Sequence, residues 1–447
     1  MIQKIKSIIN QGETRSHLVK TFFIYGFISL SIIILRVLIA RFYGQEELGI
    51  FTYFFSLVSL IYLFSSLSLP DALTQVIIKQ PQLLKQTLLR VVWQIIPPTI
   101  IFTLLALFVT DIINLNPEME NFTAAVALYI ITYTIHYLTY SILRGFKKFA
   151  AASWFSLLNR TLAIVFLIIM FFFSFSFSAV LLSMSAALLI AGVLAIPSII
   201  KAMKEKKRDS IGQMTPPEQE HTQKKESFME NLHSREFFHI TLALFLMQVS
   251  IYTLRFVDAL VINYLADFNS LGLYSAHSSI INVIRLIGYV LPMVVVPMAA
   301  VNRYKLRTSF KKIMIILVPF SAVVLVGNYL LIPWLYGPEY QVTYLPIALV
   351  ISSMMLNIYS YFNSIFVGEN KHSSFFIRIL WIDFALSMIL NTALNFLFVY
   401  YWGIIGAPIA ISLVLTIKIA LNLYGIKMLR GRSTSDNERE LTSEATY

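Results

Sequence analysis

The stretch that decides the fold runs from Gln248 to Tyr289 and reads QVSIYTLRFVDALVINYLADFNSLGLYSAHSSIINVIRLIGY. It contains two consecutive apolar segments of membrane-spanning length. Three charged residues, Arg255, Asp258 and Arg285, lie inside these segments. An Arg or Asp at the centre of a spanning helix costs about 2.5–3.5 kcal/mol, so such residues usually face protein or a watery cavity. The stretch therefore predicts membrane helices with a polar path beside them.

The composition of the whole chain indicates an integral membrane protein. Of its 447 residues, 57% are hydrophobic and 13% are charged, and the mean hydropathy is +0.74. There is no Cys, which excludes disulfide frameworks, Cys-ligated zinc and thiol catalysis. A net charge of +12 is compatible with nucleic-acid binding, but the cytoplasmic loops of membrane proteins also collect Lys and Arg. We expect no nucleic-acid partner, and residues 1–20 do not have the pattern of a cleaved signal peptide.

Twelve segments of the chain are apolar over the roughly 20 residues that a spanning helix needs. They predict an all-α membrane protein with six helices in each half, and the two long segments, the eighth and the eleventh, are expected to be tilted or broken. The predicted spans are 18–40, 48–68, 88–110, 122–143, 151–173, 178–200, 238–265, 271–299, 312–336, 344–367, 374–400 and 403–426. The predicted parts are a tail (1–17), an N-terminal lobe (18–200), a linker (201–237), a C-terminal lobe (238–426) and a second tail (427–447).

The loops between these spans differ in charge. Lys and Arg fill the two tails and every second loop, whereas the alternate loops hold only Arg41. By the positive-inside rule, both termini are expected in the cytoplasm. The basic residues left inside the membrane are Arg36, Arg160, Arg255, Arg285 and Lys418.

The two halves look like repeats of one another. Leu48-Gly49 recurs as Leu271-Gly272, and Gly145 recurs as Gly368 at the same distance along the chain. An even number of spans in each half gives both copies the same orientation, related by an axis along the membrane normal. A binding site is then expected between the two bundles near the midplane.

Four short motifs resemble the polysaccharide-exporting branch of the multidrug/oligosaccharidyl-lipid/polysaccharide (MOP) flippase superfamily. The first is R-x-x-G-x-x-x-x-G, which spans Arg41 to Gly49 at the junction of the first two predicted spans. The others are Leu143-Arg-Gly145, Tyr336-Gly337-Pro-Glu-Tyr340 and Tyr401-Trp-Gly403-Ile-Ile-Gly406-Ala407. Together they recur in order over nearly the whole chain.

This resemblance implies a V-shaped pair of six-helix bundles in the bacterial inner membrane. Such a protein alternates access to move undecaprenyl-pyrophosphate-linked sugars to the outer leaflet, in a pathway for O-antigen, capsule or exopolysaccharide. The implied partners are the lipid-linked oligosaccharide, membrane lipids and, further along the pathway, polysaccharide polymerase and export proteins. No cofactor and no catalytic residue are implied.

The charged residues of the opening stretch are the first candidates for a substrate site. Arg255 and Asp258 share a helical face with Gln248, while Arg285 lies in a polar stripe with Asn282. Guanidinium groups suit pyrophosphate because their planar forks pair with its oxygens in a bidentate manner. The alternative is that Arg255 and Asp258, three residues apart, only neutralise each other, with Asp258 as a partner or coupling carboxylate.

Three further charges in the membrane have open roles. Arg36 either faces the cavity or extends to the outer interface. Arg160 and Asp383 occupy equivalent positions of the two repeats, so they form an ion pair or lie in separate lobes, and we favour a structural role for both. Lys418 lies close to the cytoplasmic end of the last span and is expected to snorkel.

Aromatic and proline residues supply two more predictions. Tyr129, Tyr133, Tyr137 and Tyr140 lie along one side of the fourth span, where they either stack on sugar rings or pack between helices. Proline in a spanning helix permits bending, so the prolines of the third and eighth spans are hinges or fixed kinks. These prolines are Pro97, Pro98, Pro292 and Pro297. We predict no metal site.

The sequence therefore favours a flippase for a lipid-linked oligosaccharide rather than an enzyme. A drug or cation exporter of the same superfamily is the nearest alternative, although it would favour intramembrane carboxylates over the five basic residues found here. A membrane polysaccharide polymerase or ligase is a second alternative. It would need a sizeable external loop, and the external loops are short.

Overall fold

The computed structural model of the protein describes residues 26–79, 84–112, 121–146, 148–211, 235–301, 306–369 and 374–444. The regular structure of these residues is helical, which confirms the predicted all-α membrane fold. Among them, eight helices are long and apolar enough to cross a membrane. One of the eight, Ile377–Met428, covers two of the predicted spans. The count of twelve stays a prediction.

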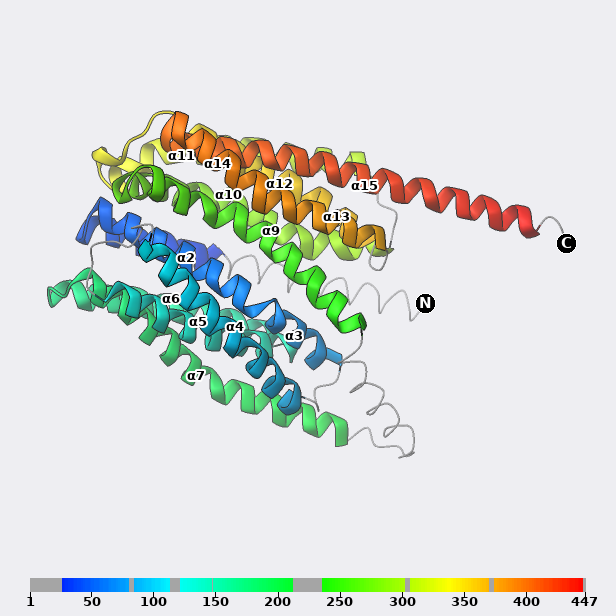
Figure 1. Ribbon diagram of the computed structural model, residues 1–447, viewed down its shortest axis with the longest axis horizontal. Helices are drawn as coiled ribbons and strands as arrows, with labels where there is room; N and C mark the ends of the chain where they lie inside the picture. The colour runs from blue at the N-terminus through cyan, green and yellow to red at the C-terminus, as the bar shows by residue number, and fades with distance from the viewer. Residues whose placement is uncertain are drawn as a thin grey trace. The chain divides into compact units, whose positions relative to one another are not determined.

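The chain divides into two compact units, Met1–Tyr252 and Thr253–Tyr447. The described helices of unit 1 are residues 26–42, α2 (Gln45–Ser66), α3 (Leu69–Lys79), α4 (Leu84–Ile112), α5 (Phe122–Gly145), α6 (Phe149–Phe172), α7 (Phe177–Ile211) and the first part of α9 (Arg235–Leu265). Figure 1 shows these helices running alongside one another. Within unit 1, α5 lies against both α3 and α7. Helix α5 is thus the central element of this unit.

Helix α3 lies between two predicted spans, 48–68 and 88–110, where no helix was expected. A turn at Leu67 and Ser68, with φ of 47° and 58°, separates α3 from α2. The apolar side of α3 then packs on α5, where a Cβ at Gly145 would lie 2.6 Å from the Cβ of Ile77. This close approach holds α3 and its Asp71 against the end of α5.

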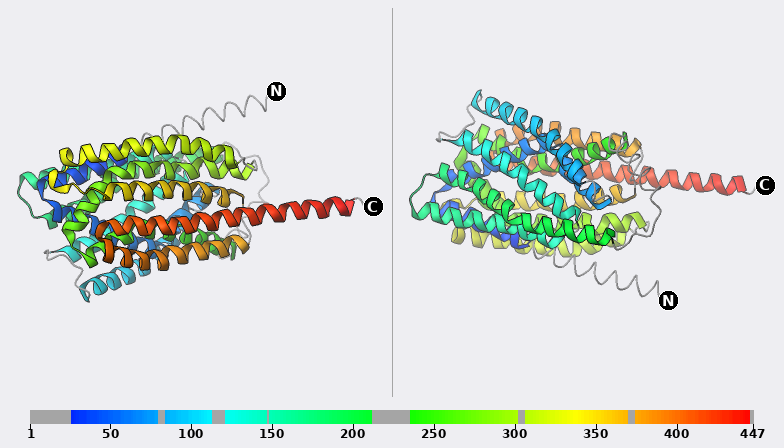
Figure 2. Two further views of the ribbon diagram at one scale, coloured as in Figure 1. Left: turned by 90° about the horizontal axis from the view of Figure 1, so that it is seen from above. Right: turned by 90° about the horizontal axis from the view of Figure 1, so that it is seen from below.

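Unit 2 contains the second part of α9 followed by α10 (Phe268–Val301), α11 (Leu306–Leu335), α12 (Leu345–Glu369), α13 (Ser374–Ala385), α14 (Asn391–Trp402) and α15 (Gly406–Glu444). Helix α12 packs against α10 and α15. Asn357 of α12 donates to the carbonyl of Ile284 at 3.0 Å, and a Cβ at Gly288 would meet the Asn357 side chain at 2.6 Å. The C-terminal part of α15 extends beyond the helices it packs against (Figure 2).

A π-helical turn, Leu386–Leu390, joins α13 to α14. It lies inside the eleventh predicted span, which was expected to be tilted or broken. Such turns insert an extra residue into a helix and are frequent at functional sites. Here the turn begins three residues after the buried Asp383.

Two of the motif glycines have backbone conformations that other residues rarely adopt. Gly44 precedes α2 with φ of 122°, and Gly337 precedes the short 3-10 helix Pro338–Tyr340 with φ of 133°. Since a Cβ is strained in this region, glycine is required at both turns. The motifs therefore reflect how neighbouring helices are connected.

The predicted hinge prolines fall inside continuous helices. Pro97 and Pro98 lie within α4. Helix α10 runs through Pro292 and Pro297, whose side chains lie outside the described residues. Their role as hinges stays a prediction.

Candidate functional site

Four tyrosine rings follow one another along α5. The centroid distances are 5.9 Å from Tyr129 to Tyr133, 6.3 Å from Tyr133 to Tyr137 and 6.0 Å from Tyr137 to Tyr140. We refer to these four side chains as the tyrosine row. Tyr62 of α2 packs on the row at 4.9 Å from Tyr133 and 5.2 Å from Tyr137. Tyr129 is buried, whereas the other three rings of the row are partly exposed.

A guanidinium group lies near each end of the tyrosine row. Arg160 of α6 is within electrostatic reach of Tyr129. At the other end, the guanidinium carbon of Arg144 lies 5.5 Å from the centroid of the Tyr140 ring. Both cations belong to unit 1, so the tyrosine row and two positive charges share one set of helices.

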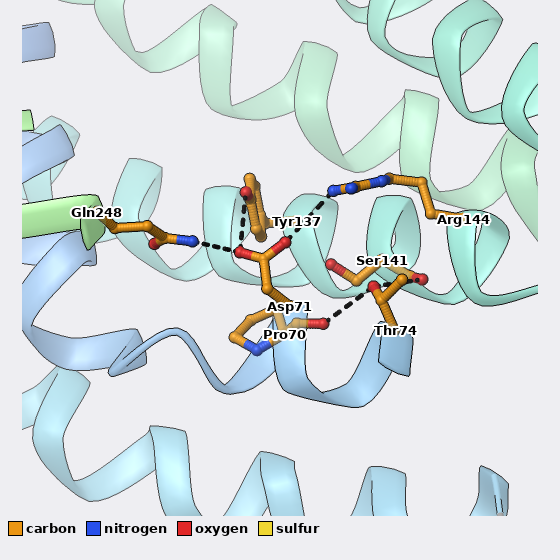
Figure 3. Close-up of polar contacts among 7 residues, drawn as sticks. All are labelled: Pro70, Asp71, Thr74, Tyr137, Ser141, Arg144 and Gln248. Atoms are coloured by element: carbon orange, nitrogen blue, oxygen red, sulfur yellow. Dashed lines mark hydrogen bonds and ion pairs between the residues drawn. The ribbon is translucent and has the colours of Figure 1, made fainter. Parts of the chain in front are cut away.

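Asp71 of α3 joins the row to another helix (Figure 3). Arg144 Nη1 lies 3.3 Å from Asp71 Oδ1, and the Tyr137 hydroxyl lies 3.5 Å from Oδ2. The side-chain amide of Gln248, on α9, also donates to Oδ2. We call Asp71, Tyr137, Arg144 and Gln248 the Asp71 cluster. Asp71 was not among the expected site residues, because it lies between the predicted spans 48–68 and 88–110.

Unit 2 holds Arg285, a predicted substrate residue, and Asp258, a predicted partner or coupling carboxylate. Arg285 is buried and donates from Nε to Ser353 Oγ at 3.1 Å. Asp258 is also buried, and it accepts hydrogen bonds from the Tyr274 hydroxyl and, at 2.8 Å, from the backbone N–H of Ala259. Arg285 is within electrostatic reach of both Asp258 and Tyr274. The buried cation and the carboxylate of the neighbouring helix are therefore close enough to interact.

The other predicted substrate residues lie in different environments. Arg255 is exposed, and its guanidinium carbon lies 5.2 Å from the ring centroid of Phe256. Asn282 and Arg36 are both partly buried. The structure thus places Asp258 against Tyr274 and near Arg285, while the substrate roles of Arg255, Asn282 and Arg36 stay predictions.

Asp383 has a partner that the sequence analysis did not propose. Its Oδ2 lies 3.2 Å from the Nζ of Lys418, and it accepts hydrogen bonds from the Tyr359 hydroxyl at 3.1 and 3.2 Å. The expectation that Lys418 snorkels is wrong, because its side chain is 0% exposed. The cation next to Asp383 is thus Lys418, whereas Arg160, the proposed partner, belongs to unit 1.

Two histidines of the predicted spans have structural contacts. His136 stacks on Phe155 at a centroid distance of 4.2 Å. The ring nitrogens of His277 lie 2.7 Å from Asn328 Oδ1 and 2.9 Å from the carbonyl of Tyr340. Within the described ranges, no three His, Asp or Glu side chains gather closely enough to hold a metal ion.

Comparisons with known proteins identify the family to which the chain belongs. A family model described as "Polysaccharide biosynthesis protein" matches residues 19–302. No curated protein matches the chain. Among solved structures, the chain is similar to an inward-facing multidrug resistance MATE family transporter of the MOP superfamily. The identity is 15% and the TM-score is 0.58, and the match covers 91% of this chain and 96% of that chain. It is also similar to the lipid II flippase MurJ in an inward closed conformation, with 18% identity, a TM-score of 0.57, and coverage of 91% and 87%.

These findings confirm the resemblance that the motifs indicated. The two solved structures share the fold at low identity. The family model matches more than half of the chain. The chain is a multi-pass membrane protein of the polysaccharide biosynthesis protein family, with the fold of the MOP superfamily.

Proposed function

We propose that this protein is a flippase for oligosaccharide repeat units linked to undecaprenyl pyrophosphate. It moves them from the cytoplasmic to the outer leaflet of the bacterial inner membrane, for the assembly of O-antigen, capsule or exopolysaccharide. Both termini lie in the cytoplasm, and transport proceeds by alternating access without a bond-making step. A polysaccharide polymerase and export proteins would act on the translocated units.

The observation that carries this proposal is the tyrosine row with a guanidinium group near each end. Aromatic faces present apolar area with a polar edge, which suits the faces of sugar rings. Guanidinium groups pair with pyrophosphate oxygens. Outward movement of the anionic head group is electrically downhill by about 2.3 kcal/mol per charge per 100 mV.

A flipping assay with the purified protein tests the proposal. The full-length chain is reconstituted into vesicles that contain a polyprenyl-pyrophosphate-linked oligosaccharide with a fluorescent sugar. We expect the vesicles with protein to expose more of the labelled head group to a membrane-impermeant quencher than protein-free vesicles do. Equal exposure in the two preparations, with the protein folded, would reject the flippase.

Export of an organic cation is the second candidate function, because a MATE transporter shares the fold. A protein that binds an organic cation is expected to do so with a carboxylate that is not paired with a cation of its own chain. Asp71 and Asp383 are each in an ion pair with a cation of the chain, and Asp258 is within reach of Arg285. Ethidium efflux from the same vesicles, without lipid flipping, would favour the exporter instead.

Tyr133→Leu should lower flipping by about 2- to 10-fold, the equivalent of the 0.5–1.5 kcal/mol that an aromatic stacking contact contributes. Tyr133→Phe should flip at nearly the wild-type rate, because the ring is retained. Phe171→Leu is the matched control, since Phe171 stacks on Phe42 at 4.0 Å in the same unit but outside the row. Initial rates in the vesicle assay measure all three variants. A sugar-stacking role is excluded if Tyr133→Leu and Phe171→Leu behave alike.

A further inference from the structure

Arg144 belongs to the Leu143-Arg-Gly145 motif, and the family resemblance gives this residue no role. Its side chain is 36% exposed and lies at the last ring of the tyrosine row. In the structure, one guanidinium nitrogen lies 3.3 Å from one carboxylate oxygen of Asp71. Arg144 is therefore an accessible cation at one end of the tyrosine row, and a carboxylate already contacts it. These are features of a binding site for an anion.

We propose that Arg144 binds the pyrophosphoryl group of the lipid-linked substrate, and that Asp71 occupies the Arg144 guanidinium until this group replaces it. The inference rests on the proposed flippase function and assigns a residue pair to it. Arg144 is the binding residue, and Asp71 is a positioning residue that competes with the substrate.

The chemistry of the two anions favours this exchange. An ion pair at 3.3 Å whose two side chains are 36% and 16% exposed is weakened by water, which screens the charges, and by the freedom that the side chains lose in forming it. A pyrophosphoryl group carries more charge than a carboxylate and can engage both arms of the guanidinium fork. The sugars next to it would lie along the tyrosine row.

The exchange also has a consequence for α9. Asp71 Oδ2, the oxygen that accepts from Gln248, is part of the same carboxylate that holds Arg144. Gln248 lies in the part of α9 that belongs to unit 1, shortly before the helix enters unit 2 at Thr253. When the substrate takes Arg144, Asp71 loses its cation, and the carboxylate is free to shift relative to Gln248. By linkage, a change that weakens the Asp71–Arg144 pair and leaves Arg144 intact, such as loss of the Asp71 charge, should strengthen binding of the anion.

The chain offers a matched control in a second ion pair of unit 1. Lys148 Nζ lies 2.5 Å from Glu205 Oε2, and the two side chains are 44% and 42% exposed. This pair also joins a cation just after α5 to a carboxylate of another helix. Replacing it tests whether the loss of any ion pair in this region alters binding.

The test measures affinity for farnesyl pyrophosphate in full-length protein, reconstituted in nanodiscs of zwitterionic lipid. We expect Arg144→Gln to weaken binding by about tenfold or more and Asp71→Asn to tighten it by about 3- to 10-fold. Lys148→Gln and Glu205→Gln should each change it by less than about twofold. Farnesol, which lacks the charge, should not respond to any of these substitutions. Thermal unfolding identifies variants that do not fold, and Arg144→Lys, which keeps the charge but not the fork, then replaces Arg144→Gln and should bind more weakly than the wild type.

The opposite results overturn the inference in distinguishable ways. If the wild type flips the lipid-linked oligosaccharide and Arg144→Gln binds farnesyl pyrophosphate normally, the inference is wrong and the proposed function stands. If Asp71→Asn weakens binding, Asp71 supports the site rather than competing for it. If phosphatidylglycerol in the nanodisc displaces the probe, or inorganic pyrophosphate binds as tightly, Arg144 recognises a bulk lipid or a free anion instead of the lipid-linked group. If the wild type neither binds the probe nor flips the lipid, both proposals fail.

Discussion

Lys418→Met lowers the free energy of unfolding by about 3–5 kcal/mol, which is the usual cost of leaving one member of a buried ion pair without the other. The Lys418 side chain is 0% exposed, and its Nζ lies 3.2 Å from Asp383 and 2.7 Å from Ser387 Oγ. The Nζ also lies 4.5 Å from the ring centroid of Tyr359. Met is unbranched and of similar length, so the loss reflects the missing charge more than a cavity. Denaturation of the purified protein in detergent micelles measures it.

Removal of both charges separates this explanation from a simple packing defect. Asp383→Asn/Lys418→Met should recover most of the lost stability, because a neutral pair carries no uncompensated charge. Lys148→Met, at an exposed ion pair, should change stability much less. If the single variant Lys418→Met were as stable as the wild type, Asp383 would not be a charged partner of Lys418.

The Asp383–Lys418 pair shows which information the sequence lacks. Hydropathy placed both residues in apolar helices, but the rotation of α13 against α15 depends on packing between them. The π-helical turn Leu386–Leu390 adds a residue after Asp383, so the helical periodicity does not carry from α13 into α14. The packing of these helices could not be predicted from the sequence. Lys418 was therefore expected to extend to the membrane interface from near the end of the predicted span 403–426.

Helix α3 was missed for a different reason. Its boundary with α2 is formed by Leu67 and Ser68, which both have positive φ although neither is a glycine. Positive φ at such residues has no reliable sequence signal. With the boundary unseen, Asp71 was assigned to a loop, and the Asp71 cluster could not be anticipated.

Features that follow from spacing within one helix were predictable. The separations of three or four residues between Tyr129, Tyr133, Tyr137 and Tyr140 place these rings on one side of α5, as the structure shows. The same rule suggested that Arg255 and Asp258 could pair. That pairing stays a prediction, and the structure shows a contact of Asp258 that the rule does not give: Asp258 accepts a hydrogen bond from the hydroxyl of Tyr274 on α10, which only the packing of two helices defines.

Arg285→Ala should lower flipping by at least about 30-fold, the rate equivalent of the roughly 2 kcal/mol lost when a buried charged contact is removed. We expect the variant still to accumulate in the membrane. Asp258 keeps the hydrogen bonds from Tyr274 and the backbone of Ala259, and it can take up a proton when the nearby cation is absent. Export of the lipid-linked oligosaccharide by cells, normalised to the amount of protein in the membrane, measures the effect.

Three further variants show whether the loss comes from the cation itself. Ser353→Ala removes the acceptor at 3.1 Å from Arg285 Nε but keeps the charge, so it should reduce export only slightly. Arg285→Lys keeps the charge and loses the planar fork, and an intermediate rate is expected. Should Arg285→Ala fail to accumulate, Arg285→Ala/Asp258→Asn restores the charge balance of the pair, and we expect it to accumulate without exporting. Export at the wild-type rate by Arg285→Ala or by Arg285→Ala/Asp258→Asn would rule out a cationic substrate site at this position, because transport would then need no positive charge there.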